Sequence, residues 1–136
     1  VGVLVDSCVL LDVLEDDPQW FEWSVRQLER CSEEGALLIN PIIYAEVSIG
    51  FERIEELEIQ VRSMGLKFQA LPREALFLAG KVFLDYRRHG GQRRSPLPDF
   101  FIGAHAAVAG WELLTRDVAR YRTYFPRVKL IHPLEQ

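Results

Sequence analysis

The chain has 136 residues, 49% of them hydrophobic and 26% charged, which fits one globular domain with a sizeable core, and we predict a single domain over residues 1–136. The formal net charge of −4 argues against bulk electrostatic binding to nucleic acid, although a local basic patch is compatible with it. Because we expect no signal peptide before the first strand and find no apolar run near the roughly 18 to 20 residues of a membrane span, we expect a cytoplasmic protein without membrane association.

Two buried strands are predicted in the N-terminal part of the chain. Residues 1–5 are apolar and rich in valine, which predicts a central strand, and Asp6 follows directly at its end. A short helix over residues 9–14 and a longer one over residues 20–33 come next, and residues 36–39 predict the second strand. The expected packing side of the longer helix consists of Phe21, Val25, Leu28 and Cys31.

Asn40 and Pro41 mark the start of a helix that carries Glu46. Asparagine is a preferred N-cap, and proline suits the first helical position because its missing N–H would have no partner there. Glu46 is then expected beside an apolar flank, about two turns from the strand end. The expected packing face of this helix consists of Ile42, Ala45 and Ile49.

The middle of the chain predicts two further helices with a short strand between them. The first covers about residues 51–64, the strand covers residues 67–71, and the second helix covers residues 73–88. In the first helix, Ile54, Leu57, Val61 and Met64 are expected inward, and Glu52, Glu55, Glu56 and Glu58 form a solvated face. The apolar side of the second consists of Leu76, Ala79, Val82, Phe83 and Tyr86.

Another helix is predicted to begin at Pro98 and to end at Gly110. Asp99 would lie in its first turn, where exposed N–H groups and the positive end of the helix dipole favour an ionised carboxylate. The expected packing side consists of Phe101, Ala104, His105 and Val108.

A strand over residues 112–115, a short helix after Asp117 and a strand over residues 128–131 complete the pattern. Alternating strands and helices predict an α/β fold with a mostly parallel sheet of four to five strands and helices on both faces. In such sheets, ligands bind outside the carboxyl ends of the strands. The acids expected to collect at that edge are Asp6, Glu46, Asp99 and Asp117.

Carboxylates held close together repel one another, and burial pushes their pKa values up until some become neutral. A divalent cation removes that conflict, and an oxygen-only ligand set favours Mg²⁺ or Mn²⁺ over zinc. The three histidines are scattered, and the two cysteines, Cys8 and Cys31, are expected to be reduced core residues. A site of this kind suits phosphodiester hydrolysis, because the metal activates water and neutralises charge on phosphate oxygens.

Four motifs stand in an order that resembles a known family: VLVDSCVLLD, PIIYAEV, LPDFFIGAHA and LLTRD. The chain resembles PIN-domain endoribonucleases, and among them the VapC-type toxins of prokaryotic toxin–antitoxin pairs. The motifs span nearly the whole chain. The resemblance implies a PIN-like three-layer fold, a specific RNA as substrate, a homodimer and a cognate VapB-like antitoxin.

The resemblance also implies roles for individual residues. It assigns Mg²⁺ or Mn²⁺ binding and catalysis to Asp6, Glu46, Asp99 and Asp117, with Asp117 acting either directly or through water. Ser7 and Thr115 would support the acids or the bound water. Cys8 departs from the pattern, since many relatives have asparagine at that position.

Several alternatives stay open from the sequence. Each aspartate taken alone is more often a cap or turn residue, and Asp12, Asp16 and Asp17 are interpreted as turn or surface residues. The basic residues are candidates for RNA contacts or solvated helix ends: Arg87, Arg88, Arg93, Arg94 and Arg116. Trp20, Trp23, Trp111, Tyr121 and Phe125 are interpreted as core or dimer contacts. Competing functions are a catalytically silent PIN module that binds RNA or protein, and a phosphoryl-transfer receiver or phosphatase with Asp6 as nucleophile.

Overall fold

A parallel sheet forms the centre of the computed structural model, which describes residues 2–135. Within these residues the sheet has five strands in the order β3-β2-β1-β4-β5, and all neighbouring strands are parallel. The predicted α/β fold is therefore confirmed. Val1, the first residue of the predicted first strand, lies outside the described residues. The strands are β1 (Gly2–Val5), β2 (Ala36–Ile39), β3 (Leu66–Phe68), β4 (Glu112–Leu114) and β5 (Leu130–Ile131).

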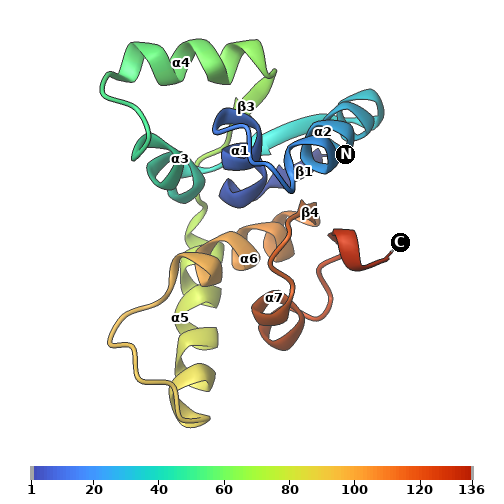
Figure 1. Ribbon diagram of the computed structural model, residues 1–136. Coiled ribbons are helices and arrows are strands. Elements are labelled where there is room, and N and C mark those ends of the chain that lie inside the picture. Colours follow the sequence, from blue (N-terminus) through green and yellow to red (C-terminus); the bar gives the residue numbers. More distant parts are fainter. Residues whose placement is uncertain (1, 136) are drawn as a thin grey trace.

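Helices cover both faces of the sheet (Figure 1). α1 and α2 pack together on one side, whereas α6 packs between α5 and α7 on the other. Among residues 2–135, none of these helices combines the length and hydrophobicity that a bilayer crossing needs. The helices are α1 (Ser7–Leu14), α2 (Phe21–Glu34), α3 (Pro41–Ser48), α4 (Ile54–Ser63), α5 (Arg73–Arg88), α6 (Pro98–Ala109) and α7 (Ala119–Tyr124), followed by a 3-10 turn (Pro133–Glu135).

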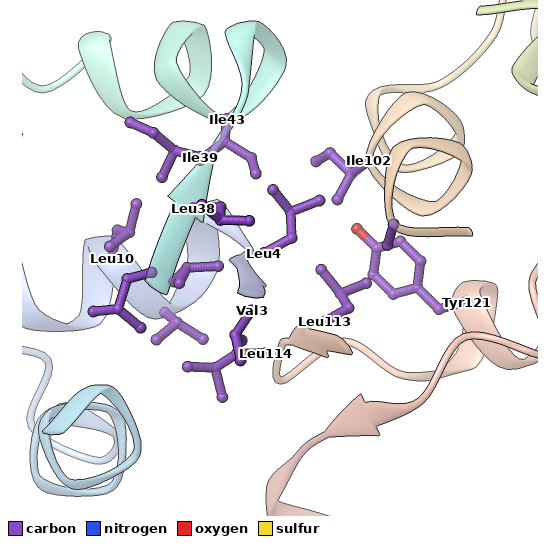
Figure 2. Close-up of a cluster of buried hydrophobic side chains, with 14 of the residues drawn as sticks. Val3, Leu4, Leu10, Leu38, Ile39, Ile43, Ile102, Leu113, Leu114 and Tyr121 are labelled. Atoms are coloured by element: carbon purple, nitrogen blue, oxygen red, sulfur yellow. The ribbon is translucent and has the colours of Figure 1, made fainter. Parts of the chain in front are cut away.

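Alternate residues of β1 supply the two halves of the core. Leu4 pairs in register with Leu113, and Figure 2 shows both on the side of the sheet where Tyr121 of α7 lies. Val5 and Leu114 form the next pair and point to the opposite face, because successive side chains of a strand alternate. Both pairs are 0% exposed, as expected for strands buried on both faces.

The predicted helix boundaries near the acids are confirmed. Asn40 caps α3 by accepting the N–H of Ile43 at 2.9 Å, and Pro41 occupies the first position. Pro98 begins α6, which ends at Gly110 with a φ of 73°, in the left-handed region that favours glycine. These boundaries fix where Glu46 and Asp99 leave the backbone.

The predicted packing face of α3, made of Ile42, Ala45 and Ile49, is wrong. Ala45 is exposed and Ile49 is 86% exposed, whereas Ile43 is fully buried. Ile42 and Ile43 are adjacent apolar residues, so two faces of this helix fit the helical spacing about equally well. Glu46 follows Ile43 by three residues, and the observed rotation therefore brings its carboxylate next to the buried side.

Four other helices pack along sides that differ in part from the predicted ones. Each of these helices has apolar residues on more than one side, so spacing alone leaves its rotation open. Residues predicted inward but exposed are Ile54 at 63%, Leu76 at 44% and Val108 at 42%. The buried side of α2 consists of Ser24, Gln27, Leu28 and Cys31, so Phe21 and Val25 are only half-buried. Glu58, predicted as solvated, accepts a hydrogen bond from the Tyr44 hydroxyl at 2.6 Å.

Candidate functional site

Asp6 lies at the junction of β1 and α1 and is only 5% exposed. It caps α1, because its Oδ1 accepts the N–H of Ser7 at 2.8 Å. Its own N–H donates to the carbonyl of Leu114 at 2.9 Å, which continues the pairing of β1 with β4 by one residue. The carboxylate is therefore held at the carboxyl edge of the two central strands, where ligands bind in sheets of this kind.

The second oxygen of Asp6 accepts two hydroxyl hydrogen bonds. Thr115 Oγ1 donates to Asp6 Oδ2 at 2.8 Å, and the Tyr121 hydroxyl donates to the same oxygen at 3.1 Å. Thr115 and Tyr121 are both 0% exposed. Thr115, predicted as a supporting residue, thus contacts the first acid. Tyr121 is a core residue, as interpreted from the sequence, but its hydroxyl also reaches the acids, which no local pattern indicated.

Glu46 is tied to the start of α1 through a serine. Ser7 Oγ donates to Glu46 Oε1 at 2.8 Å, so the predicted supporting residue Ser7 orients the acid of α3.

A second link joins α3 to α6, because Asn40 Nδ2 lies 3.2 Å from His105 Nδ1. The Asn40 oxygen already accepts the cap hydrogen bond, so its amide donates to the histidine ring. Burial lowers the pKa of His105, which favours the neutral form that this contact requires.

Asp99 lies in the first turn of α6, as predicted, and faces α7. Arg120 Nη1 lies 3.5 Å from Asp99 Oδ2, and the Tyr121 hydroxyl lies 3.5 Å from Asp99 Oδ1. Tyr121 therefore stands between the carboxylates of Asp6 and Asp99. Asp117 lies just beyond β4 with an exposed side chain, and its N–H donates to Thr115 Oγ1 at 3.0 Å.

The acids behave as one electrostatic unit. Burial raises the pKa of Asp6, Glu46 and Asp99, and the acids add to this effect through their mutual repulsion. The charge of Glu46 raises the pKa of Asp6, that of Asp99 raises the pKa of Glu46, and those of Asp6 and Asp117 raise the pKa of Asp99. The hydrogen bond from Thr115 opposes the rise at Asp6.

The donor chemistry of the site fits a hard divalent cation. Its side chains offer carboxylate and hydroxyl oxygens, which Mg²⁺ and Mn²⁺ prefer, and a cation would relieve the repulsion that raises the pKa values. Among residues 2–135, no three His, Cys, Asp or Glu side chains already converge as a closed metal site. Both Asp6 oxygens accept hydrogen bonds from the protein. The acids are therefore a candidate ligand set whose side chains would have to move closer together to coordinate an ion.

The predicted arginines fall into two groups. The first group lies at the end of α5 and in the loop before α6, and all its side chains are exposed: Arg87, Arg88, Arg93 and Arg94. Arg87 Nη1 donates to the carbonyl of Arg93 at 2.6 Å, which ties the helix end to that loop. Arg116 stands apart from them and pairs with Asp12 inside the protein.

The interpretation of Asp12 as a turn or surface residue is wrong. Asp12 lies inside α1 and is 3% exposed. Its Oδ2 accepts hydrogen bonds from Arg116 Nε and Ser24 Oγ, each at 2.7 Å, and its Oδ1 accepts one from Arg116 Nη2 at 2.8 Å. The cause of the error is the acidic stretch that follows, which ends the helix only after Leu14. Cys8 and Cys31 are free thiols, as predicted.

Comparisons with known proteins agree with the fold. Residues 3–126 match the sequence model of the PIN domain family. No curated protein matches the chain in a sequence comparison.

Solved structures of toxin–antitoxin complexes have a similar fold. A chain of VapBC2 from Rickettsia felis, bound to a DNA fragment from their promoter, has a TM-score of 0.76 at 16% identity, over 98% of this chain and 99% of that chain. A chain of FitAcB from Neisseria gonorrhoeae has a TM-score of 0.71 at 18% identity, over 98% of this chain and 99% of that chain. A chain of VapBC-1 from nontypeable Haemophilus influenzae has a TM-score of 0.71 at 14% identity, over 97% of this chain and 98% of that chain. At such identities the likeness shows a shared fold.

Proposed function

The chain belongs to the PIN domain family, and from this premise we propose that it is a Mg²⁺- or Mn²⁺-dependent endoribonuclease that hydrolyses phosphodiester bonds in a specific RNA. One observation carries the proposal. Asp6 and Asp99, which are far apart in the chain, lie on either side of the Tyr121 hydroxyl; burial raises the pKa of both, and the charge of Asp6 raises that of Asp99 further. Raised pKa values among clustered carboxylates favour a functional site, and a bound cation would relieve the repulsion between them.

Asp6, Glu46, Asp99 and Asp117 would hold the metal. When bound, it would lower the pKa of a water molecule and neutralise charge that develops on the phosphate oxygens. The chain's own residues hold the ligands in place. Thr115 and the N–H of Ser7 fix Asp6, and the hydroxyl of Ser7 fixes Glu46. Asp117, exposed beside Asp99, is the acid best placed to meet a large substrate.

The cellular role that we propose is the toxin component of a type II toxin–antitoxin pair, with a VapB-like antitoxin as partner and a homodimer as the assembly. The support is the fold shared with VapBC and FitAcB chains over nearly their full lengths. Expression of the chain alone should arrest growth, and co-expression of the neighbouring small reading frame should restore growth and yield a complex. Growth that is unaffected by active wild-type protein would reject the toxin role but not the nuclease.

The nuclease test uses purified protein, mixed RNA, and Mg²⁺ or Mn²⁺. Asp6→Asn and Asp99→Asn should each lower the rate by roughly a hundredfold or more, since each removes charge from the site with little change in shape. Asp85→Asn is the matched control, because Asp85 is an exposed aspartate on α5. Cleavage that persists in both site variants, at the control rate, would reject the assignment.

A catalytically silent PIN module that binds RNA or protein is the second candidate. One observation favours it: Asp6 accepts hydrogen bonds at both oxygens, and no closed metal site exists within residues 2–135. Isothermal titration with Mn²⁺ separates the two candidates. Binding in the micromolar to millimolar range that Asp6→Asn abolishes supports the nuclease, whereas partner binding without Mn²⁺ binding supports the silent module.

A further inference from the structure

Arg116 stands between two residues of the acidic site, yet its guanidinium group is paired inside the protein. Its Nε lies 2.7 Å from Asp12 Oδ2 and its Nη2 lies 2.8 Å from Asp12 Oδ1. This is the two-pronged geometry that makes arginine–carboxylate pairs strong and directional. The Arg116 side chain is 25% exposed, whereas that of Asp12 is 3% exposed.

The surroundings of the pair are built to hold it. Ser24 of α2 donates a third hydrogen bond to Asp12 at 2.7 Å, and the guanidinium carbon of Arg116 lies 5.0 Å from the centre of the Trp20 ring. A carboxylate buried to this degree requires a charged partner, since an unpaired one is strongly unfavourable. The buried charge of Asp12 therefore favours keeping the Arg116 guanidinium in this contact.

The pair joins the same two segments that form the site. Asp6 is the N-cap of α1 and Asp12 lies within α1, while Thr115 and Arg116 are adjacent in the loop after β4. Thr115 contacts Asp6, and Arg116 contacts Asp12. These two cross-links hold the loop against α1 at two points.

We propose that Asp12 and Arg116 are positioning residues, which hold Thr115 and Asp117 in register with Asp6. The inference rests on the proposed nuclease function for its catalytic consequence. It gives Arg116 a role different from an RNA contact, because two of its donor nitrogens are already engaged by a residue that RNA does not reach. The effect on the reaction is indirect, through the placement of the acids, so kcat should change and KM should not.

Asp12→Asn is the decisive variant, because it removes the charge of a buried residue while keeping its shape. Amide hydrogen exchange gives a readout independent of catalysis. The N–H of Asp117 donates to Thr115 Oγ1, and the N–H of Leu113 donates to the carbonyl of Lys129 in the same sheet. In Asp12→Asn, exchange at Asp117 should speed up by about tenfold or more, while exchange at Leu113 stays unchanged. Equal changes at both amides, or none, would overturn the proposal.

Enzyme kinetics and Mn²⁺ titration complete the test. Asp12→Asn should lower kcat by about ten- to a hundredfold, leave KM unchanged and weaken Mn²⁺ binding. Arg116→Lys should keep only part of the wild-type rate. Lys129→Gln is the control, since it removes the Lys129–Glu112 ion pair of 3.2 Å at the other end of β4. A raised KM in Arg116→Lys with a normal Asp12→Asn enzyme would show that Arg116 contacts RNA instead. Wild-type protein without ribonuclease activity would reject the proposed function and leave the exchange test intact.

Discussion

Replacing Thr115 by valine removes one hydroxyl with little change in volume, and it tests how the protein tolerates Asp6. The Thr115 hydroxyl donates to Asp6 at 2.8 Å and accepts the N–H of Asp117 at 3.0 Å, in a position with 0% exposure. A hydrogen bond to a charged group contributes about 1.5 to 3 kcal/mol, and one between neutral groups contributes about 0.5 to 1.5 kcal/mol. We therefore expect Thr115→Val to lose about 2 to 4 kcal/mol in the free energy of unfolding at pH 7.

The stability lost in Thr115→Val should depend on pH, and the direction of that dependence follows from the burial of Asp6. Burial raises the pKa of Asp6 above its ordinary value of 3.8, so the folded state binds more protons than the unfolded state between the two pKa values. The Asp6 contribution to stability therefore falls as pH rises through that window. The Thr115 hydrogen bond opposes the rise, so Thr115→Val widens the window. At pH 4 or below, with the carboxyl more protonated, the loss should shrink to about 1 kcal/mol.

Urea unfolding followed by tryptophan fluorescence at pH 7 and pH 4 measures both values. Thr123→Val is the matched control, because Thr123 is exposed and its hydroxyl donates to the carbonyl of Ala119 in its own helix. An equal loss at both pH values would refute the charge argument. A loss no greater than that of Thr123→Val would refute the hydrogen bond itself.

Two further predictions concern the rest of the site. Tyr121→Phe should lose about 1 to 2 kcal/mol of stability in EDTA at pH 7, because Asp6 loses a hydrogen bond. Added Mn²⁺ should reduce this loss, since a cation then offsets the repulsion between the acids; an unchanged loss in urea unfolding would contradict cation binding there. The double variant Arg93→Gln, Arg94→Gln should weaken RNA binding and lower the slope of log K against log salt by about 0.7 for each phosphate that the protein no longer neutralises. Arg62→Gln, which changes an exposed residue of α4, is the control in filter-binding assays. If the double variant and the control have equal salt slopes, Arg93 and Arg94 are solvated residues that do not contact RNA.

The order of elements is predictable from the sequence because short, local signals decide it. Asn40 before Pro41, Pro98 and Gly110 mark helix boundaries through groups within a few residues of themselves. The rotation of each helix is harder to predict. Ile42 and Ile43 lie on two apolar stripes of similar character, and only burial in the core distinguishes Ile43.

The acids could be proposed from the sequence because a family pattern links positions that are distant in the chain. Tyr121 and Asp12 have no such mark. A buried hydroxyl that reaches an acid 115 residues away, as Tyr121 reaches Asp6, leaves no periodic signal near either residue. Asp12 precedes Asp16 and Asp17, and an acidic stretch usually indicates a turn, whereas its actual partner, Arg116, is 104 residues distant.

The parallel order of the sheet also determines when the site can exist. β1 lies between β2 and β4 in the sheet and precedes β4 by more than a hundred residues in the chain, so the two strands can pair only after that length has been synthesised. Asp6 receives its hydroxyl partners only when Thr115 and Tyr121 have emerged from the ribosome, at roughly 5 to 20 residues per second. Until then Asp6 has the adjacent N–H of Ser7 as a partner but lacks the two hydroxyls that contact its other oxygen. A nascent chain therefore has several seconds in which it can fold, or meet a partner, before the site that we propose for phosphodiester hydrolysis is complete.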